Sequence, residues 1–342
     1  MAVSVGRPTA AVRRRLSAVT DRPVWAVLAA AAVAHLAGLS LPVEARYGLL
    51  LATLVVLGLP HGALDHLTPP RANGDAPTLR WVAGFSAVYL AVAVAYGLAW
   101  FLAPTASFLF FLLLTWLHWG QGDRAHLAVV ADADHVSGWV GRLTIAVRGG
   151  LPMLVPLLAF PERYRSVLVT AVELFAPDGA GWVAPLFRAD VRLALGVGFA
   201  ALTLSTLYAG YRVAGATDAW RTDAAETGLL WAFFLAVPPV LAIGLYFALW
   251  HSLRHLVRLL ALDSAAADAL ESGADGRAVW RLVRDATPMT VGALLLFGGL
   301  ALAVPQTPGS VAEVGGLYLV LLAVVTLPHV GVVTWLDRKQ GL

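Results

Sequence analysis

Nine long apolar runs dominate this chain of 342 residues. They cover residues 24–41, 47–64, 81–102, 107–119, 139–160, 191–211, 228–250, 289–304 and 314–335. A helix needs about 20 mostly apolar residues to cross the hydrocarbon core of a bilayer. Inside that core, only helices and closed barrels satisfy all of their backbone hydrogen bonds. The pattern therefore predicts an all-α fold, a polytopic transmembrane bundle of about 8 to 10 spans.

A tenth run, residues 164–187, is interrupted by Glu173, Pro177 and Asp178 and could be a span or a shorter re-entrant piece. Positive residues accumulate on the cytoplasmic side of membrane proteins. Counted from a cytoplasmic N-terminus, ten spans place roughly three quarters of the basic residues inside, whereas nine spans remove that asymmetry. We therefore expect ten spans, a multi-pass location in the plasma membrane, and both termini in the cytoplasm.

The composition supports one membrane domain. Hydrophobic residues make up 59% of the chain and charged residues 13%. The net charge of +3 comes from arginines that lie between apolar runs. Their positions indicate which loops face the cytoplasm, and they give no reason to expect a nucleic-acid partner. The chain has no cysteine, so a metal site cannot use thiolate ligands. We expect a basic cytoplasmic tail at 1–23, a single transmembrane domain at 24–337, and a short C-terminal tail at 338–342.

Four histidines stand at the tips of apolar runs and are the candidate metal ligands. They are His61 in LPHGALDH, His118 in WLHWGQGD, and His251 and His255 in WHSLRH. An ionisable group at that depth is costly unless it has partners, and a transition metal suits imidazole. His251 and His255 are four residues apart, which places both on one helix face. In the ten-span topology all four lie toward the same side of the membrane, so a common site is possible.

Other polar residues near these histidines are candidate supporting groups. Asp65 follows His61 by four residues and can hydrogen-bond an imidazole. Gly120 and Gly122 are expected to loosen the helix end after His118, so that a neighbouring side chain can fold back towards the ring. The supporting candidates are Asp65, Gln121, Asp123 and Arg254, and the further possible site residues are His66 and His329.

The remaining histidines give weaker signals. His35 is expected to be a packing residue, and His126 and His135 are expected to be exposed in a loop after the fourth span. Aromatic side chains flank the ligand candidates, as in an interfacial belt or around a long conjugated substrate. The residues expected to line a substrate tunnel are Trp116, Trp119, Tyr246, Phe247 and Trp250.

Four motifs, in order and across nearly the whole chain, carry a family resemblance: LPHGALDH, HWGQGD, HSLRH and PHVGVVTWLD. Together they resemble the Brp/Blh family of membrane β-carotene 15,15′-dioxygenases, which make retinal for microbial rhodopsins. The resemblance implies non-haem Fe(2+) held by four histidines, here His61, His118, His251 and His255. It also implies that O2 cleaves the central double bond of β-carotene to give two retinals.

Two other classes of function stay open at this stage. A di-iron membrane hydroxylase or desaturase also uses histidine clusters, but it normally needs HxxHH-type boxes, and none of the nine histidines here are adjacent. A transporter or a rhodopsin assembly partner would use intramembrane histidines as a proton relay. Metal analysis separates these classes, because a relay needs no bound iron.

Overall fold

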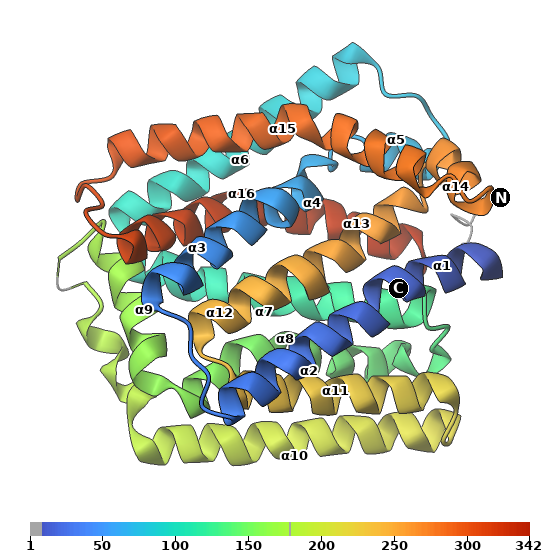
Figure 1. Ribbon diagram of the computed structural model, residues 1–342. Helices are drawn as coiled ribbons and strands as arrows, with labels where there is room; N and C mark the ends of the chain where they lie inside the picture. Colours follow the sequence, from blue (N-terminus) through green and yellow to red (C-terminus); the bar gives the residue numbers. More distant parts are fainter. Residues whose placement is uncertain (1–8, 178) are drawn as a thin grey trace.

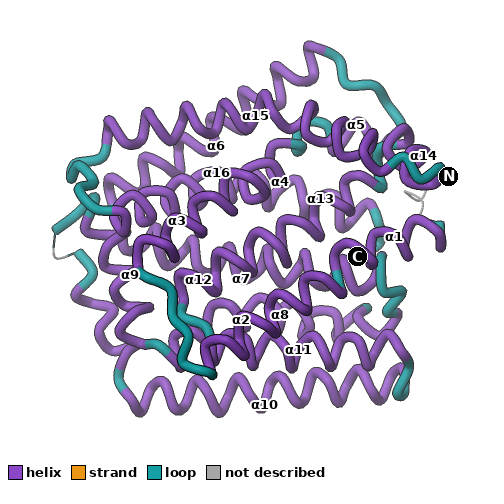
Figure 2. Tube along the Cα trace, in the orientation of Figure 1, coloured by secondary structure: helices purple, strands orange, loops and turns teal. Residues whose placement is uncertain are grey.

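The computed structural model describes residues 9–177 and 179–342, and this part of the chain is helical with connecting loops (Figure 2). The α-helices are α1 (Ala10–Thr20), α2 (Arg22–Leu36), α3 (Val43–Thr53), α4 (Leu59–Ala63), α5 (Thr68–Asn73), α6 (Leu79–Leu102), α7 (Pro104–Val129), α8 (Gly138–Ala159), α9 (Pro161–Glu173), α10 (Ala189–Ala214), α11 (Asp218–Ala236), α12 (Pro239–Leu245), α13 (Leu253–Leu260), α14 (Ser264–Glu271), α15 (Asp275–Ala303) and α16 (Val311–Lys339). Short π or 3-10 segments are η1 (Leu54–Gly58), η2 (Asp134–Val136), η3 (Gly181–Phe187) and η4 (Tyr246–Ser252).

Eight helical stretches are long and apolar enough to cross a membrane: 10–36, 43–63, 79–102, 138–159, 189–214, 239–260, 275–303 and 311–339. The helices α7 and α11 run beside them (Figure 1) but contain buried polar side chains, which lower their mean hydropathy. The structure therefore confirms an all-α membrane bundle and holds two further long helices beside the eight stretches.

The long helices lie roughly side by side, with α7, α13 and α16 in the middle of the bundle (Figure 1). The start of α1 and the end of α16 lie at the same end of the bundle, and α9 lies at the opposite end. This arrangement agrees with the predicted even number of crossings.

Two of the predicted spans are wrong in detail. The run 164–187 is not a span, because it divides into the end of the short α9 and the 3-10 segment η3. The run 228–250 is not one helix, because Val237 is extended (φ −100°, ψ 130°) and separates α11 from α12. Proline disfavours helical backbone in the residue before it and removes a helix donor, so Pro238 and Pro239 explain that break.

Part of the segment expected to be a tail is a helix. In α1, Val12 and Leu16 are buried against Val257 and Leu270 from the other end of the chain. Residues 1–8 of that segment, and Asp178 of the tenth run, lie outside the described residues.

The helix that follows His118 does not end at the glycines. α7 continues through Gly120 and Gly122 to Val129. A Cβ on Gly120 would lie 2.1 Å from the carbonyl oxygen of Ile145, and one on Gly122 would lie 3.2 Å from the His251 ring. These glycines therefore let α7 approach α8 and make room for an imidazole, and the prediction that they loosen a helix end after His118 was wrong.

The contact between α7 and α8 gives a stability prediction. A Cβ on Gly149 of α8 would lie 1.8 Å from the carbonyl oxygen of Trp116, and backbone atoms cannot move aside cheaply. We expect Gly149→Ala to lower the free energy of unfolding by about 1–3 kcal/mol through overpacking. Gly198→Ala in α10 is the matched control, because its Cβ would meet no atom within 4 Å. The control should be neutral or gain about 0.5–1 kcal/mol. Unfolding in detergent measures both, and equal stability of the two variants would contradict the packing account.

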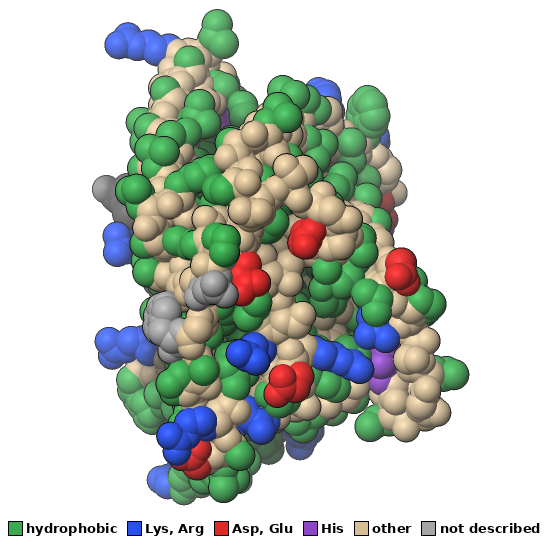
Figure 3. All heavy atoms as spheres, turned by 90° about the vertical axis from the view of Figure 1, so that its left-hand side faces the viewer, with side chains coloured by type: hydrophobic (Ala, Val, Ile, Leu, Met, Phe, Trp, Pro, Cys, Tyr) green, Lys and Arg blue, Asp and Glu red, His purple; other side chains and the backbone are tan. Residues whose placement is uncertain are grey.

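Large hydrophobic side chains stay exposed on the outer helices. Leu98 on α6 is 58% exposed, Val197 on α10 63%, and Leu295 on α15 72%. Hydrophobic side chains also cover much of the end of the bundle seen in Figure 3, with scattered charged groups among them. Such a surface is stable in lipid and would be an aggregation hazard in water.

Candidate metal centre

His61 lies directly after an irregular turn of its helix. The π segment η1 (Leu54–Gly58) connects α3 to α4. Pro60 has no backbone N–H and cannot complete a regular helical bond, which favours such a wider turn, and π segments are frequent at functional sites. His61 Nδ1 donates to the carbonyl oxygen of Gly58. The Nε2 lone pair of His61 therefore remains available to a ligand.

A second π segment carries the WHSLRH motif. η4 holds His251, and His255 follows in α13. The centroids of these two rings lie 5.5 Å and 5.7 Å from that of His61. Both imidazoles therefore contact His61, and their four-residue spacing had predicted only that they share one helix face.

His118 on α7 and His329 on α16 complete a cluster of five imidazoles. The Nε2 atoms of His118 and His251 lie 2.9 Å apart. The ring centroid of His329 lies 4.7 Å from that of His118, 4.8 Å from that of His61 and 5.2 Å from that of His255. All five side chains are buried. His329, which the sequence marked only as a possible site residue, is thus in contact with three of the four principal candidates.

The cluster offers nitrogen atoms that no side chain satisfies. Nδ1 of His118 and His251, and Nε2 of His255 and His329, are buried without a hydrogen-bond partner. One possible ligand atom from each of His61, His118 and His329 lies within 4.8 Å of the other two. Buried polar atoms normally have partners, so an ion among these rings would account for the unpartnered Nε2 atoms of His255 and His329.

Asp65 orients the ring of His329. Its Oδ2 accepts a hydrogen bond from His329 Nδ1 at 2.7 Å. Because a carboxylate fixes Nδ1 as the protonated nitrogen, the Nε2 lone pair of His329 points away from Asp65. Asp65, His255 and His329 also form a second group with ligand atoms within 4.8 Å of one another. The imidazole that Asp65 binds is that of His329, and not that of His61, whose helix face the sequence expected it to share.

The donor set fits a first-row transition metal. Imidazole nitrogen suits iron, zinc, copper and nickel, whereas magnesium and calcium prefer oxygen ligands. Among the five rings, only His329 donates a hydrogen bond to a carboxylate in the described structure. The residues can therefore hold a metal ion in a site that is rich in neutral imidazole.

Two largely apolar cavities flank the histidines. The first is lined by Trp119 and Phe247 and extends towards α8, α9 and the start of α16. The second is lined by His61, Asp65, His66 and His329 and extends between α6, α15 and α16. No histidine lines the first cavity, but Phe247, which does, forms an edge contact with His61, with ring centroids 5.4 Å apart. Leu322 lines both.

The residues expected to line a tunnel divide into two groups. Trp119 and Phe247 line the first cavity, whereas Trp116, Tyr246 and Trp250 line neither cavity. The Trp116 indole donates to the carbonyl oxygen of Ala146 at 2.8 Å, and Tyr246 and Trp250 are fully buried. These three rings hold helices together, because helix packing as well as substrate binding places aromatic residues near a site.

Comparison with known proteins settles the class of the chain. The sequence profile described as "Beta-carotene 15,15'-dioxygenase" matches residues 52–337. The chain belongs to this family, Brp/Blh. It is 48% identical to the "Probable beta-carotene 15,15'-dioxygenase Blh" of Halobacterium salinarum, over 98% of this chain and 96% of that relative. It is 32% identical to Brp of the same organism, over 93% of this chain and 90% of that relative. No solved structure was found to match.

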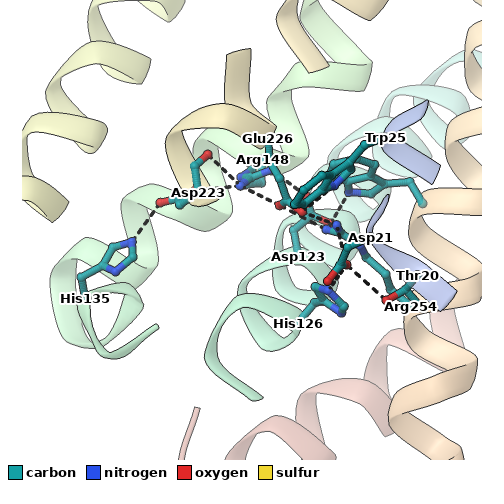
Figure 4. Close-up of polar contacts among 11 residues, drawn as sticks. Thr20, Asp21, Trp25, Asp123, His126, His135, Arg148, Asp223, Glu226 and Arg254 are labelled. Carbon is teal, nitrogen blue, oxygen red and sulfur yellow. Dashed lines mark hydrogen bonds and ion pairs between the residues drawn. The ribbon is translucent and has the colours of Figure 1, made fainter. Parts of the chain in front are cut away.

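Next to its histidines the dioxygenase holds a buried network of charges (Figure 4). Arg148 on α8 lies 2.7 Å from Asp223, 3.1 Å from Glu226 and 3.5 Å from Asp123. Arg254 also pairs with Glu226. Four helices, α7, α8, α11 and α13, are thus joined by ion pairs that lie away from water. Because α7 carries His118 and α13 carries His255, the network helps to fix where these two imidazoles lie.

Two supporting candidates belong to this network and not to the imidazole cluster. Asp123 accepts a hydrogen bond from the indole of Trp250 at 2.8 Å, and does not fold back to His118. The Arg254 guanidinium lies over the Trp250 ring, 3.8 Å from its centroid, and pairs with Asp21 at 3.3 Å. Both residues therefore pair with side chains on neighbouring helices of the bundle.

Gln121, a supporting candidate, and His66, a further possible site residue, lie at the edge of the histidine site. Gln121 donates to the hydroxyl of Thr334 on α16 at 3.2 Å. His66 lines the second cavity, and its Nδ1 donates to the carbonyl oxygen of Ala63. Burial lowers the pKa of His66, so its imidazole is neutral near pH 7.

The prediction that His126 and His135 are exposed was wrong. They are 4% and 1% exposed, and they pair with Asp21 at 2.8 Å and with Asp223 at 3.0 Å. The sequence reading ended α7 too early and so placed His126 in a loop. The reading also missed Arg148, although an arginine inside an apolar run is itself a signal of a buried partner. Both histidines extend the charge network of the dioxygenase.

Proposed function

We propose that this dioxygenase cleaves the central 15,15′ double bond of β-carotene with O2 at an Fe(2+) ion held by buried histidines. One β-carotene and one O2 give two all-trans-retinal molecules, so each new aldehyde takes one oxygen atom. The observation that carries the proposal is a cluster of buried imidazoles that lines one apolar cavity and is separated from a second by the ring of Phe247.

The ligands proposed from the motifs are His61, His118, His251 and His255. The contacts of His329 support its inclusion as a fifth imidazole, with Asp65 fixing its tautomer. A bound iron ion would supply the O2 and one-electron chemistry that zinc, which has no redox states, cannot. The protein's own task is to hold the rings before the ion arrives, since a preorganised site needs no rearrangement during the reaction.

The two cavities support central cleavage. β-Carotene is a symmetric apolar rod, and a site between two apolar chambers can take one half of the rod in each. Trp119 and Phe247 would contact one half, and Phe85 and Tyr89 would contact the other. Such walls place the midpoint of the substrate near the imidazoles and exclude water, which contributes to rate through positioning.

The membrane setting of the reaction is part of the proposal. The substrate is soluble in the lipid bilayer, and retinal would pass from there to a microbial rhodopsin. The basic residues at both ends of the chain favour a plasma-membrane protein with cytoplasmic termini. Reporter fusions at Leu342 test this orientation, and an external C-terminus would contradict it.

Expression in cells that make β-carotene tests the proposed reaction. We expect the carotene to disappear while about two retinal molecules accumulate for each one lost, since a central cut gives two identical halves. Extraction and chromatography measure both compounds. A long apocarotenal would show eccentric cleavage, and a hydroxylated carotenoid with an intact chain would show a different oxygenase.

A further inference from the structure

The second cavity is a groove with three helical walls, which we term the α6–α15 groove. On α15 the lining residues are Met289, Gly292, Ala293 and Leu296, at spacings of three and four residues. The α6 wall includes Phe85, Tyr89, Leu90 and Ala93, and the α16 wall includes Leu322, Val325, Thr326 and His329. Each set follows one face of its helix. Three regular helices therefore form the groove along part of their length.

The floor of the groove is the imidazole cluster. His61 and His329 both line it, and their ring centroids lie 4.8 Å apart. Gly62 also lines the groove and has no side chain. A Cβ there would meet the ring of His329 at 3.6 Å. A molecule in the groove would thus contact the proposed metal ligands without passing another barrier of side chains.

The rim of the groove faces outward. Leu90 is 54% exposed, and Gly292 is exposed as well, whereas no lining residue of the first cavity is exposed. Only 6% of the most apolar stretch of α15 is buried, and 17% of that of α6. The neighbouring Val291 and Leu295 on α15 are 49% and 72% exposed. In a membrane, these surfaces contact lipid chains.

We infer that the α6–α15 groove is the lateral portal through which a rod-like, apolar polyene passes from the bilayer to the histidine cluster. The inference rests on the proposed function. The leading half of the substrate would pass the imidazoles into the first, enclosed cavity, and the trailing half would stay in the groove. An apolar substrate moving this way never leaves an apolar environment, so it avoids the free-energy cost of crossing water.

Gly292 is the position at which the portal can be narrowed with least damage. A Cβ there meets no atom within 4 Å, so a side chain projects into free space. Gly298, six residues later on the same helix, is equally open but does not line the groove. The pair Gly292→Phe and Gly298→Phe therefore separates obstruction of the groove from the general effect of a large residue on α15.

We expect Gly292→Phe to lower kcat/KM for β-carotene in vesicles by at least about tenfold, because displacement of the substrate from the reacting position is costly. Gly298→Phe should stay near wild type. Bound iron and thermal stability should be unchanged in both variants. Loss of iron in Gly292→Phe would overturn the inference in favour of a structural role for this face of α15.

A reversible version uses the absence of cysteine from the chain. Purified Gly292→Cys is treated with benzyl methanethiosulfonate, assayed in vesicles, and assayed again after reduction; Gly298→Cys is the control. We expect the label to block turnover only at Gly292→Cys and reduction to restore it. An unchanged rate in labelled Gly292→Cys would overturn the portal and leave a groove that holds lipid chains at most. Failure of the wild type to form retinal would instead overturn the proposed function.

Discussion

Replacing His118 with alanine is expected to abolish both bound iron and retinal formation. Its Nε2 atom lies 2.9 Å from that of His251, and its ring also contacts that of His329. His118 therefore contacts two other imidazoles of the cluster. The same loss is expected for alanine at His61, His251 and His255, and the structure extends it to His329. Iron content by mass spectrometry and retinal by chromatography measure the two effects in the same preparations.

His35→Ala is the matched control. His35 is partly exposed, and its Nδ1 donates to the carbonyl oxygen of Ala31 in its own helix. This variant should keep wild-type iron and activity. Asp65→Asn should fall between the extremes and lower metal affinity by about 10- to 100-fold, as for other carboxylates that orient a metal-binding histidine. Full activity with wild-type iron in His118→Ala or His329→Ala would remove that residue from the site.

Replacing Arg148 with methionine is expected to give the largest loss of stability. The guanidinium is 1% exposed and pairs with three buried carboxylates, those of Asp123, Asp223 and Glu226. Removal of one partner from a buried ion pair leaves an uncompensated charge and costs about 3–5 kcal/mol. The measurement is the free energy of unfolding in detergent, together with the yield of folded protein.

Arg188→Met is the control for charge removal. Arg188 and its partner Asp190 are 67% and 64% exposed, and such surface pairs contribute about 0–1 kcal/mol. The Arg148 variant should also weaken iron binding, because the network joins the helices that carry His118 and His255. Equal stability of the two variants would contradict the view that the charge network holds the bundle together.

The general architecture could be predicted because each apolar run reports its own helix. Length and hydropathy alone identified most of the long helices, and the order of the motifs identified the family. The exceptions were decided by backbone chemistry at a few positions. Pro238 and Pro239 divide an apolar run that looked continuous, and η3 takes the place of a span where glycine and proline interrupt the chain.

The centre was predicted less completely, because contacts between distant segments decide which polar residues meet. Gly120 looked like a helix end but is the place where α7 packs on the backbone of α8. Asp123 was expected to fold back to His118 from a loosened helix end, yet Trp250 and Arg148 are its partners. The pairing of Asp65 with His329 joins residues 264 positions apart, and no local pattern announces it.

The most direct test of the account is the conversion of β-carotene by the purified protein under O2, with its metal removed and then restored. The account predicts no retinal from the chelated protein. After addition of Fe(2+) it predicts about two retinals for each β-carotene consumed, the yield of a central cut. Zn(2+) should not restore activity, since zinc has no redox chemistry. Retinal formation that persists after complete removal of iron would contradict the central claim.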